Sequence, residues 1–156
     1  MNILVTGTSG FIGFHLANRL IADGHNVTGI DVINDYYDVN LKYGRLANAG
    51  INRADIIYGK AVKSTVYTNY TFYQINLENK NELNQIFETE EFDVVINLAA
   101  QAGVRYSIEK PDAYISSNIM AFISLLECCK HHNIKHLVYA SSSSVYGLNE
   151  AIPFST

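Results

Sequence analysis

Short apolar runs alternate along the chain with longer segments of helical period. The runs cover residues 3–6, 26–31, 71–75, 93–97 and 136–140, and branched side chains dominate them. Runs of this length and composition are typical of strands that are buried on both faces of a parallel sheet. Because strands and helices alternate, the pattern predicts an α/β fold, a doubly wound parallel sheet with helices on both faces. Right-handed crossovers give the strand order 3-2-1-4-5.

Apolar residues recur at helical spacing between these strands. The predicted helices cover residues 11–23, 39–49, 80–89 and 111–131. The first is expected to bury Ile12 with its other apolar residues, and Pro111 suits the first position of the last, where a missing N–H costs no hydrogen bond. Residues 50–69 remain unassigned. Their pieces at 56–58 and 66–67 fit either a short hairpin or an extended excursion.

The composition describes one folded domain. The chain has 156 residues, of which 48% are hydrophobic, and 11 Lys+Arg against 15 Asp+Glu give a net charge of −4. An acidic balance argues against binding nucleic acid through its phosphates. No apolar run approaches the ~18 residues that span a membrane, and the first residues lack a basic leader, so we expect a cytoplasmic protein.

Cysteine and histidine carry no predicted chemistry here. Cys128 and Cys129 are neighbours in a predicted helix, so they cannot staple distant parts of the chain, and we predict small buried thiols. His131, His132 and His136 lack the spacing of metal ligands. No metal site is therefore predicted.

A glycine-rich turn follows the first predicted strand and opens the first helix. It reads Thr6-Gly7-Thr8-Ser9-Gly10-Phe11-Ile12-Gly13. Gly7 permits a tight turn, Gly10 lets a pyrophosphate approach the backbone, and Gly13 lets the helix pack close to the sheet. The free N–H groups of the helix then meet the phosphates. With Asp31 at the end of the second strand, the turn predicts a Rossmann dinucleotide site.

Asp31 indicates whether the bound dinucleotide is NAD or NADP. It is placed to accept hydrogen bonds from the adenosine ribose hydroxyls. A carboxylate there repels a 2′-phosphate by roughly 4 kcal/mol at about 4 Å and an effective dielectric constant of about 20, so NAD is favoured over NADP. Lys42 and Arg45 could reach the adenosine end, but we interpret both as surface charges on a solvated helix face.

Three longer blocks extend the motif. They are Asn34–Asp38 (NDYYD), Asn97–Ser107 (NLAAQAGVRYS) and Tyr139–Gly147 (YASSSSVYG). With the wide G-x-x-G-x-x-G spacing, they make the chain resemble the N-terminal half of an extended short-chain dehydrogenase/reductase, specifically the UDP-glucuronate 4-epimerase branch of the nucleotide-sugar epimerases. The resemblance implies an isomerase in which bound NAD takes hydride from C4 of the sugar and returns it to the opposite face, so that NAD is not consumed.

The resemblance also implies site residues. The cofactor-binding positions would be Gly7, Gly10, Phe11, Ile12, Gly13, Asp31, Asn34, Asn76, Leu77, Leu98, Ala99, Ala100, Asn118, Ala140 and Ser141. The substrate-binding positions would be Gln101, Arg105 and Ser143, with a surface salt bridge as the open alternative for Arg105. Ser142 would be the catalytic hydroxyl that shares a substrate hydrogen bond with the base. Two departures are Val32, where the family often has Asn, and Asn76, where it commonly has Asp.

The catalytic base of the family is the Tyr of a Tyr-x-x-x-Lys pair on the helix after the serine loop. Residues 1–156 end before that helix, so we expect the base and the substrate-binding half to lie outside them and these residues alone to be inactive. Tyr106 and Lys110 have the right spacing but precede the last strand. Pro111 disfavours helical geometry at Lys110, which breaks the one-face spacing that such a pair needs.

The resemblance implies a UDP-sugar as the partner molecule, while the acidic charge argues against nucleic acid and the short apolar runs argue against a membrane. Family members commonly pair through the long helix and the tyrosine helix, so we expect a homodimer that is weakened when the second helix is missing. Two alternatives stay open: a fragment that binds NAD without catalysis, and a 4,6-dehydratase. Dehydratases tend to have an acidic residue where this chain has Ser143, which favours the epimerase.

Overall fold

A six-stranded sheet forms the centre of the computed structural model, which describes residues 1–149 and 153–154. Its strands are β1 (Asn2–Thr6), β2 (Asn26–Asp31), β3 (Ala61–Lys63), β4 (Tyr70–Gln74), β5 (Val94–Asn97) and β6 (His136–Tyr139). They lie in the order β3-β4-β2-β1-β5-β6, and all neighbours pair in parallel except β3 and β4. The five parallel strands confirm the predicted order 3-2-1-4-5.

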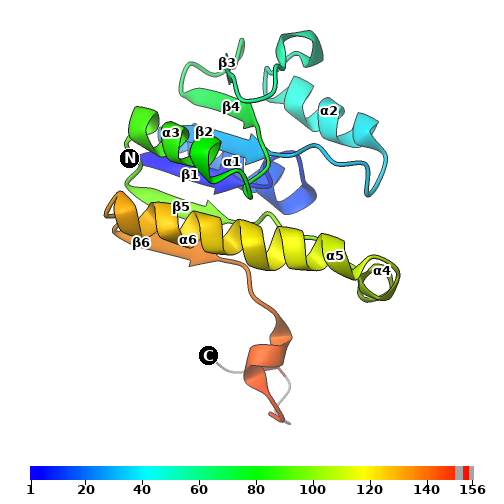
Figure 1. Ribbon diagram of the computed structural model, residues 1–156. Helices are drawn as coiled ribbons and strands as arrows, with labels where there is room; N and C mark the ends of the chain where they lie inside the picture. The colour runs from blue at the N-terminus through cyan, green and yellow to red at the C-terminus, as the bar shows by residue number, and fades with distance from the viewer. Residues whose placement is uncertain (150–152, 155–156) are drawn as a thin grey trace.

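Helices cover both faces of the sheet. They are α1 (Phe11–Ala22), α2 (Val39–Asn48), α3 (Lys80–Glu90), α4 (Val104–Glu109), α5 (Pro111–Tyr114) and α6 (Ala121–His131). In Figure 1, α3 and α6 lie in front of the sheet and α1 lies behind it. The doubly wound architecture that the alternating pattern predicts is therefore confirmed.

Each face of the sheet has its own hydrophobic core. Because side chains alternate along a strand, Leu4 of β1 enters the core under α3 and α6, while Ile3 and Val5 enter the core under α1 and α2. Cys128 and Cys129 belong to the first core as free, buried thiols, as predicted, and burial raises the pKa of Cys129 to about 11.

The unassigned stretch contributes one short edge strand. β3 pairs antiparallel with β4, and the two pieces at 56–58 and 66–67 lie outside it, so neither is the hairpin strand that the sequence suggested. The Ser64 hydroxyl explains the second piece. It donates to the Ala49 carbonyl at 2.7 Å and accepts from the N–H groups of Val66 and Tyr67 at 3.1 and 2.9 Å. These bonds fold residues 64–67 into a turn before β4.

The long helix predicted over 111–131 is helical throughout but changes its winding. Pro111 starts α5 as predicted, and Ile115–Met120 form a π-helix before α6 begins. π-helical turns are frequent at functional sites. The preceding stretch contains α4, and Lys110 lies between the helices with φ −134° and ψ 63°. Tyr106 and Lys110 therefore do not share one helix face.

Candidate functional site

The glycine-rich turn joins β1 to α1 in the way the motif predicts. The Gly7 N–H donates to the Ile30 carbonyl at 2.7 Å, and Gly7 has a φ of +76°, which favours glycine. A Cβ on Gly7 would lie 3.1 Å from the Ala99 nitrogen, and one on Gly10 would lie 3.0 Å from the Gly7 oxygen. A Cβ on Gly13 would collide with that same oxygen. The turn is consequently packed too tightly for side chains.

The start of α1 points out of the body of the protein. Gly10 supplies no side-chain cap, so the first N–H groups of the helix have no side-chain partner there. Phe11 and Ile12 are each 66% exposed. The expectation that Ile12 is buried is therefore wrong, because the helix face that packs against the sheet is the one with Gly13, Ala17 and Ile21, and Ile12 lies outside it.

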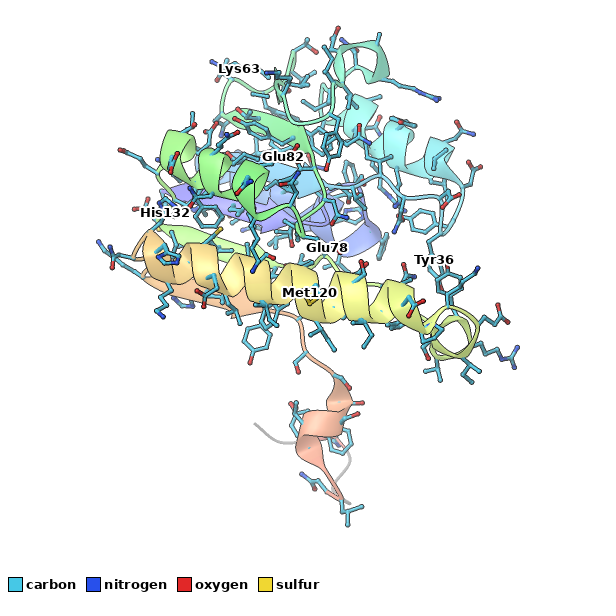
Figure 2. All side chains as sticks on the ribbon, in the orientation of Figure 1. Tyr36, Lys63, Glu78, Glu82, Met120 and His132 are labelled. Carbon is cyan, nitrogen blue, oxygen red and sulfur yellow. The ribbon has the colours of Figure 1, made fainter. Side chains whose placement is uncertain are left out.

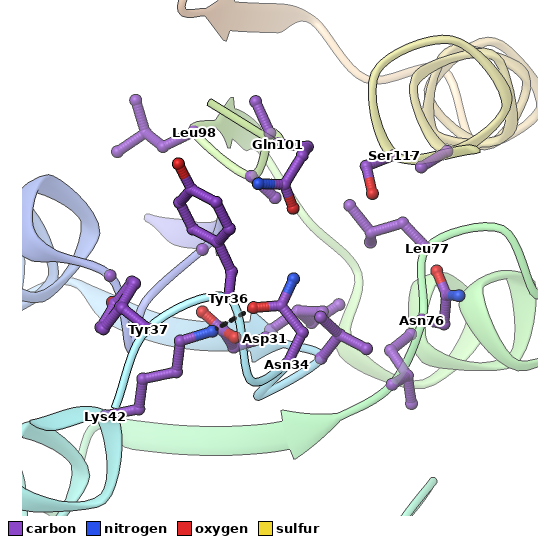
Figure 3. Close-up of a pocket in the computed structure, with 18 residues that line it drawn as sticks. Asp31, Asn34, Tyr36, Tyr37, Lys42, Asn76, Leu77, Leu98, Gln101 and Ser117 are labelled. Atoms are coloured by element: carbon purple, nitrogen blue, oxygen red, sulfur yellow. Dashed lines mark hydrogen bonds between the residues drawn. The ribbon is translucent and has the colours of Figure 1, made fainter. Parts of the chain in front are cut away.

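A pocket lies where the carboxyl ends of β1, β2, β4 and β5 meet (Figure 3). This edge of a doubly wound sheet is the usual ligand position. Ten of the predicted site residues line the pocket: Gly7, Gly10, Asp31, Asn34, Asn76, Leu77, Leu98, Ala99, Ala100 and Gln101. The other lining residues are Ile30, Val32, Tyr36, Tyr37, Lys42, Ile75, Ser117 and Ala121. The fold therefore brings together segments that are far apart in the sequence.

The buried hydroxyl of Thr6 holds two of these segments together. It donates to the Asn97 amide oxygen at 2.7 Å and accepts from the N–H groups of Leu98 and Ala99 at 3.1 and 3.0 Å. Thr6 is fully buried. This network fixes the backbone that follows β5 against Gly7 and so shapes one wall of the pocket.

Asp31 lies at the centre of the site. It is 7% exposed, and its Oδ2 accepts from the Ser9 N–H at 3.1 Å while its Oδ1 accepts from the Ile33 N–H at 2.8 Å. The first bond ties the glycine turn to the end of β2. The second supports Ile33, which has a φ of 55° that β-branched residues rarely adopt. The carboxylate is therefore held at the pocket wall by two separate backbone segments.

The interpretation of Lys42 and Arg45 as surface charges is wrong. Lys42 is 4% exposed, and its Nζ donates to the Asn34 side-chain oxygen at 2.6 Å. The Arg45 Nη1 donates to the Ser9 carbonyl at 3.0 Å and to the Tyr37 hydroxyl at 2.9 Å. α2 turns this face toward the pocket and not toward solvent.

The position of Lys42 relative to the apolar residues of the helix could have shown that it is buried. Lys42 precedes the buried Leu46 by four residues, so both lie on one face of α2. Because most residues of this helix are polar, its sequence does not distinguish the inner face, which carries the cations, from the solvated face.

Two side-chain amides support the loops on the other side of the pocket. Asn118 of the π-helix accepts from the Gln101 N–H at 2.7 Å and donates to the Gln101 carbonyl at 2.9 Å. Asn76 donates to Glu78 at 3.0 Å and accepts from the Glu78 N–H at 3.1 Å, and Ser116 also donates to that carboxylate. Glu78 thus connects the end of β4 to the π-helix (Figure 2).

Two tyrosines also shape the pocket. Both belong to the Asn34–Asp38 block, and neither was predicted as a site residue. Tyr36 lines the pocket (Figure 3), and the centroid of its ring lies 4.9 Å from that of Tyr106 on α4. Tyr37 lies beneath Lys42, whose Nζ is 4.9 Å from the ring centroid. The loop between β2 and α2 therefore covers the pocket with aromatic rings.

Other predicted residues lie outside the pocket lining. Phe11, Ile12 and Gly13 begin α1, Asn118 holds the Gln101 backbone, and Arg105 is exposed on α4. Ala140, Ser141, Ser142 and Ser143 are exposed after β6, on a segment that projects from the sheet (Figure 1). The Ser142 hydroxyl donates to the Ser144 Oγ at 3.0 Å and accepts from the Ser144 N–H at 3.1 Å. Their roles stay predictions.

Residues 1–149 and 153–154 contain no group of three or more His, Cys, Asp or Glu side chains that could hold a metal ion. Within the same residues, no helix is both long and apolar enough to span a membrane.

The comparison with known families decides what kind of protein this is. Residues 3–156 match the NAD dependent epimerase/dehydratase family. The chain belongs to that family. Its structure is similar to a UDP-glucose-4-epimerase from Stenotrophomonas maltophila with bound NAD and formylated UDP-arabinopyranose, at a TM-score of 0.75 and 27% identity over 99% of this chain and 40% of that one. The epimerase family and the Rossmann fold that the sequence indicates are both confirmed.

Curated relatives are more similar in sequence. Protein CapI of Staphylococcus aureus is 53% identical over 156 residues, which cover 100% of this chain and 42% of that protein. A probable UDP-glucuronate 4-epimerase of Rhizobium meliloti (strain 1021) is 46% identical over 154 residues, covering 99% of this chain and 41% of that protein. The chain thus spans about two fifths of the length of these relatives.

Proposed function

We propose that residues 1–156 form the NAD-binding part of a cytoplasmic enzyme that inverts C4 of a UDP-sugar, with UDP-glucuronate as the favoured substrate. The 3.1 Å hydrogen bond from the Ser9 N–H to the Asp31 carboxylate carries the proposal. It supports the proposal because it joins the turn that would accommodate a pyrophosphate to the group that would accept from the adenosine ribose. The relatives named UDP-glucuronate 4-epimerase support this choice of sugar.

The residues of the pocket fit NAD. The glycine turn has no room for side chains, so a diphosphate can lie directly against its backbone and the uncapped start of α1. Asp31 would accept from the ribose, and the backbone of Leu98–Ala100 would line the path toward the nicotinamide. When bound, NAD supplies the acceptor and donor of the C4 hydride. Ser142, on the segment that follows β6, would share the hydrogen bond to the sugar hydroxyl.

The dehydratase alternative is less well supported. The position after Ser142 holds Ser143, which has no carboxylate to act at C5 and C6. The alternative of cofactor binding without turnover applies to residues 1–156 taken alone. Tyr106 and Lys110 do not share a helix face, so this pair would not act as the base.

Coenzyme binding and turnover can be measured on the purified 156-residue chain. We expect NADH to bind, seen as enhanced and blue-shifted nicotinamide fluorescence that excess NAD reverses, because the pocket residues described above all belong to this chain. We expect no epimerisation of UDP-glucuronate or UDP-galactose. Absence of binding at millimolar NADH would contradict the cofactor proposal. Appreciable turnover would instead contradict the proposal that the base lies outside these residues.

We also propose that the whole protein pairs with a second copy along the π-helix and α6. Ile115, Ile119 and Ile123 form a stripe at a spacing of four residues and are 51%, 47% and 43% exposed. Val138 and Tyr139 of β6 are exposed as well. Exposed apolar patches of this kind commonly mark protein interfaces.

Weak self-association of the 156-residue chain is the expected result. In sedimentation equilibrium, its mean mass should rise with concentration, and Ile119→Glu should suppress that rise because it places a charge in the apolar stripe. Ile57→Glu, at a residue that is 63% exposed on the stretch before β3, is the matched control and should leave association unchanged. A strictly monomeric wild-type chain would count against the interface.

A further inference from the structure

Lys42 is a buried cation with fewer partners than its chemistry requires. Its ammonium has three donors, and the structure gives it one hydrogen bond, to the neutral amide of Asn34. Over residues 1–149 and 153–154, no carboxylate lies within ion-pair distance of it. Burying a charge is costly unless it is paired. Apart from the Tyr37 ring, whose centroid lies 4.9 Å from Nζ, the remaining donors have no partner among the described residues and lie at the wall of the pocket.

Asp31 lies at the same corner of the pocket as Lys42. Figure 3 shows the Lys42 ammonium beside the Asn34 oxygen, with the Asp31 carboxylate close by. Burial lowers the pKa of Lys42, and the nearby charge of Asp31 offsets part of that shift. A negative acceptor and a positive donor thus face one small space.

A sugar diol suits such a pair of groups. Each hydroxyl is one donor and also an acceptor, so a ribose can donate to a carboxylate while it accepts from an ammonium. A phosphate in place of one hydroxyl would be repelled by the carboxylate and attracted by the ammonium. The relative strength of these two effects decides which coenzyme binds.

We propose that Lys42 is a second ribose-binding residue and that, together with Asp31, it sets the preference between NAD and NADP. The inference rests on the proposed function, because it needs the adenosine ribose in this corner. Asp31 provides the discrimination against a 2′-phosphate, and Lys42 reduces it while strengthening binding of the free diol.

Neighbouring contacts indicate that holding the β2–α2 loop is not the sole role of Lys42. Asp38 caps α2 by accepting from the Asn40 N–H at 2.9 Å, and Arg45 binds Tyr37 of the same loop at 2.9 Å. These bonds anchor the loop in addition to the one that Lys42 makes to Asn34. Arg45 is already committed to Tyr37 and to the Ser9 carbonyl, which leaves Lys42 as the cation with free donors.

The test compares NADH and NADPH affinities of four variants of the 156-residue chain by fluorescence titration. Lys42→Met should weaken NADH binding about tenfold, the loss of one charged hydrogen bond. Asp31→Asn should strengthen NADPH binding about tenfold, and the double variant should lose that gain. Lys63→Met, an exposed charge on β3 far from the pocket (Figure 2), is the control and should change neither affinity.

The possible results separate the inference from the proposed function. If the wild-type chain binds no NADH, the proposed function fails. If it binds NADH and Lys42→Met leaves both affinities unchanged, only the inference is overturned. Equal loss of both coenzymes with a lowered thermal midpoint would assign Lys42 a structural role and also overturn it. Lys42→Gln repeats the charge removal with a polar side chain, should Met not fold.

Discussion

Asp31→Ala is expected to weaken NADH binding about 100-fold, about 2.7 kcal/mol, because it removes two charge-assisted hydrogen bonds to the ribose. NADH fluorescence titration measures this directly. The same carboxylate also accepts from the N–H groups of Ser9 and Ile33, so the variant should lose about 1–3 kcal/mol of unfolding free energy as two buried donors are left unpaired. The glycine turn would lose its hydrogen bond to the Asp31 side chain and would keep only backbone bonds, such as that from the Gly7 N–H to the Ile30 carbonyl, to the end of β2.

Asp31→Asn and Asp55→Ala serve as the controls for this result. Asparagine keeps one side-chain oxygen for the Ile33 N–H, so stability should recover more than NADH affinity does. Asp55 is an exposed carboxylate far along the chain, in the short helix Arg53–Asp55, and its loss should alter neither quantity. An NADH affinity that Asp31→Ala leaves unchanged would show that the ribose does not lie at the end of β2.

Gly13→Ala should lower the free energy of unfolding by about 3 kcal/mol, which is the scale of overpacking a tight contact. Its Cβ would fall on the Gly7 oxygen, and backbone atoms on both sides leave no flexible group to move aside. α1 would have to shift away from β1. Urea unfolding monitored by circular dichroism measures the loss, and NADH binding should fall with it because the turn would no longer hold its shape.

Gly44→Ala is the matched substitution on α2. Nothing lies within 4 Å of a Cβ at this position. The added methyl should therefore raise the free energy of unfolding by about 0.5–1 kcal/mol, the helix-propensity difference between the residues. If both alanine variants changed stability by the same amount, close packing of the turn against α1 would not be the reason for Gly13.

The strands and the coenzyme turn could be predicted because their signals are local. A parallel strand that is buried on both faces forms a nearly continuous apolar run. Residues such as Val5 and Val95 therefore indicate such a strand before its neighbouring strands are known. Gly7 and Gly13 could be predicted for the same reason, because a tight turn between a strand and a helix requires glycines at fixed positions. Asp31 could be placed at the pocket because it is the last residue of a strand that the sequence predicts.

Lys42 and the edge strand β3 could not be predicted in this way. A lysine on a polar helix is usually solvated, and only the packing of α2 against the sheet turns Lys42 toward Asn34. β3 has three residues, and its pairing with β4 depends on the bend that Ser64 creates by reaching back to Ala49. These contacts join elements whose positions depend on the rest of the fold.

By itself, the sequence determined the class of fold, the order of the parallel strands and the residues of the coenzyme turn, because each depends on burial or backbone geometry within a short stretch. The tertiary structure alone decided that α2 presents a buried ammonium near Asp31 and that a π-helix supports the Gln101 loop through Asn118. Such features arise where side chains from separate elements meet, and the faces that meet are known only once the layers have packed.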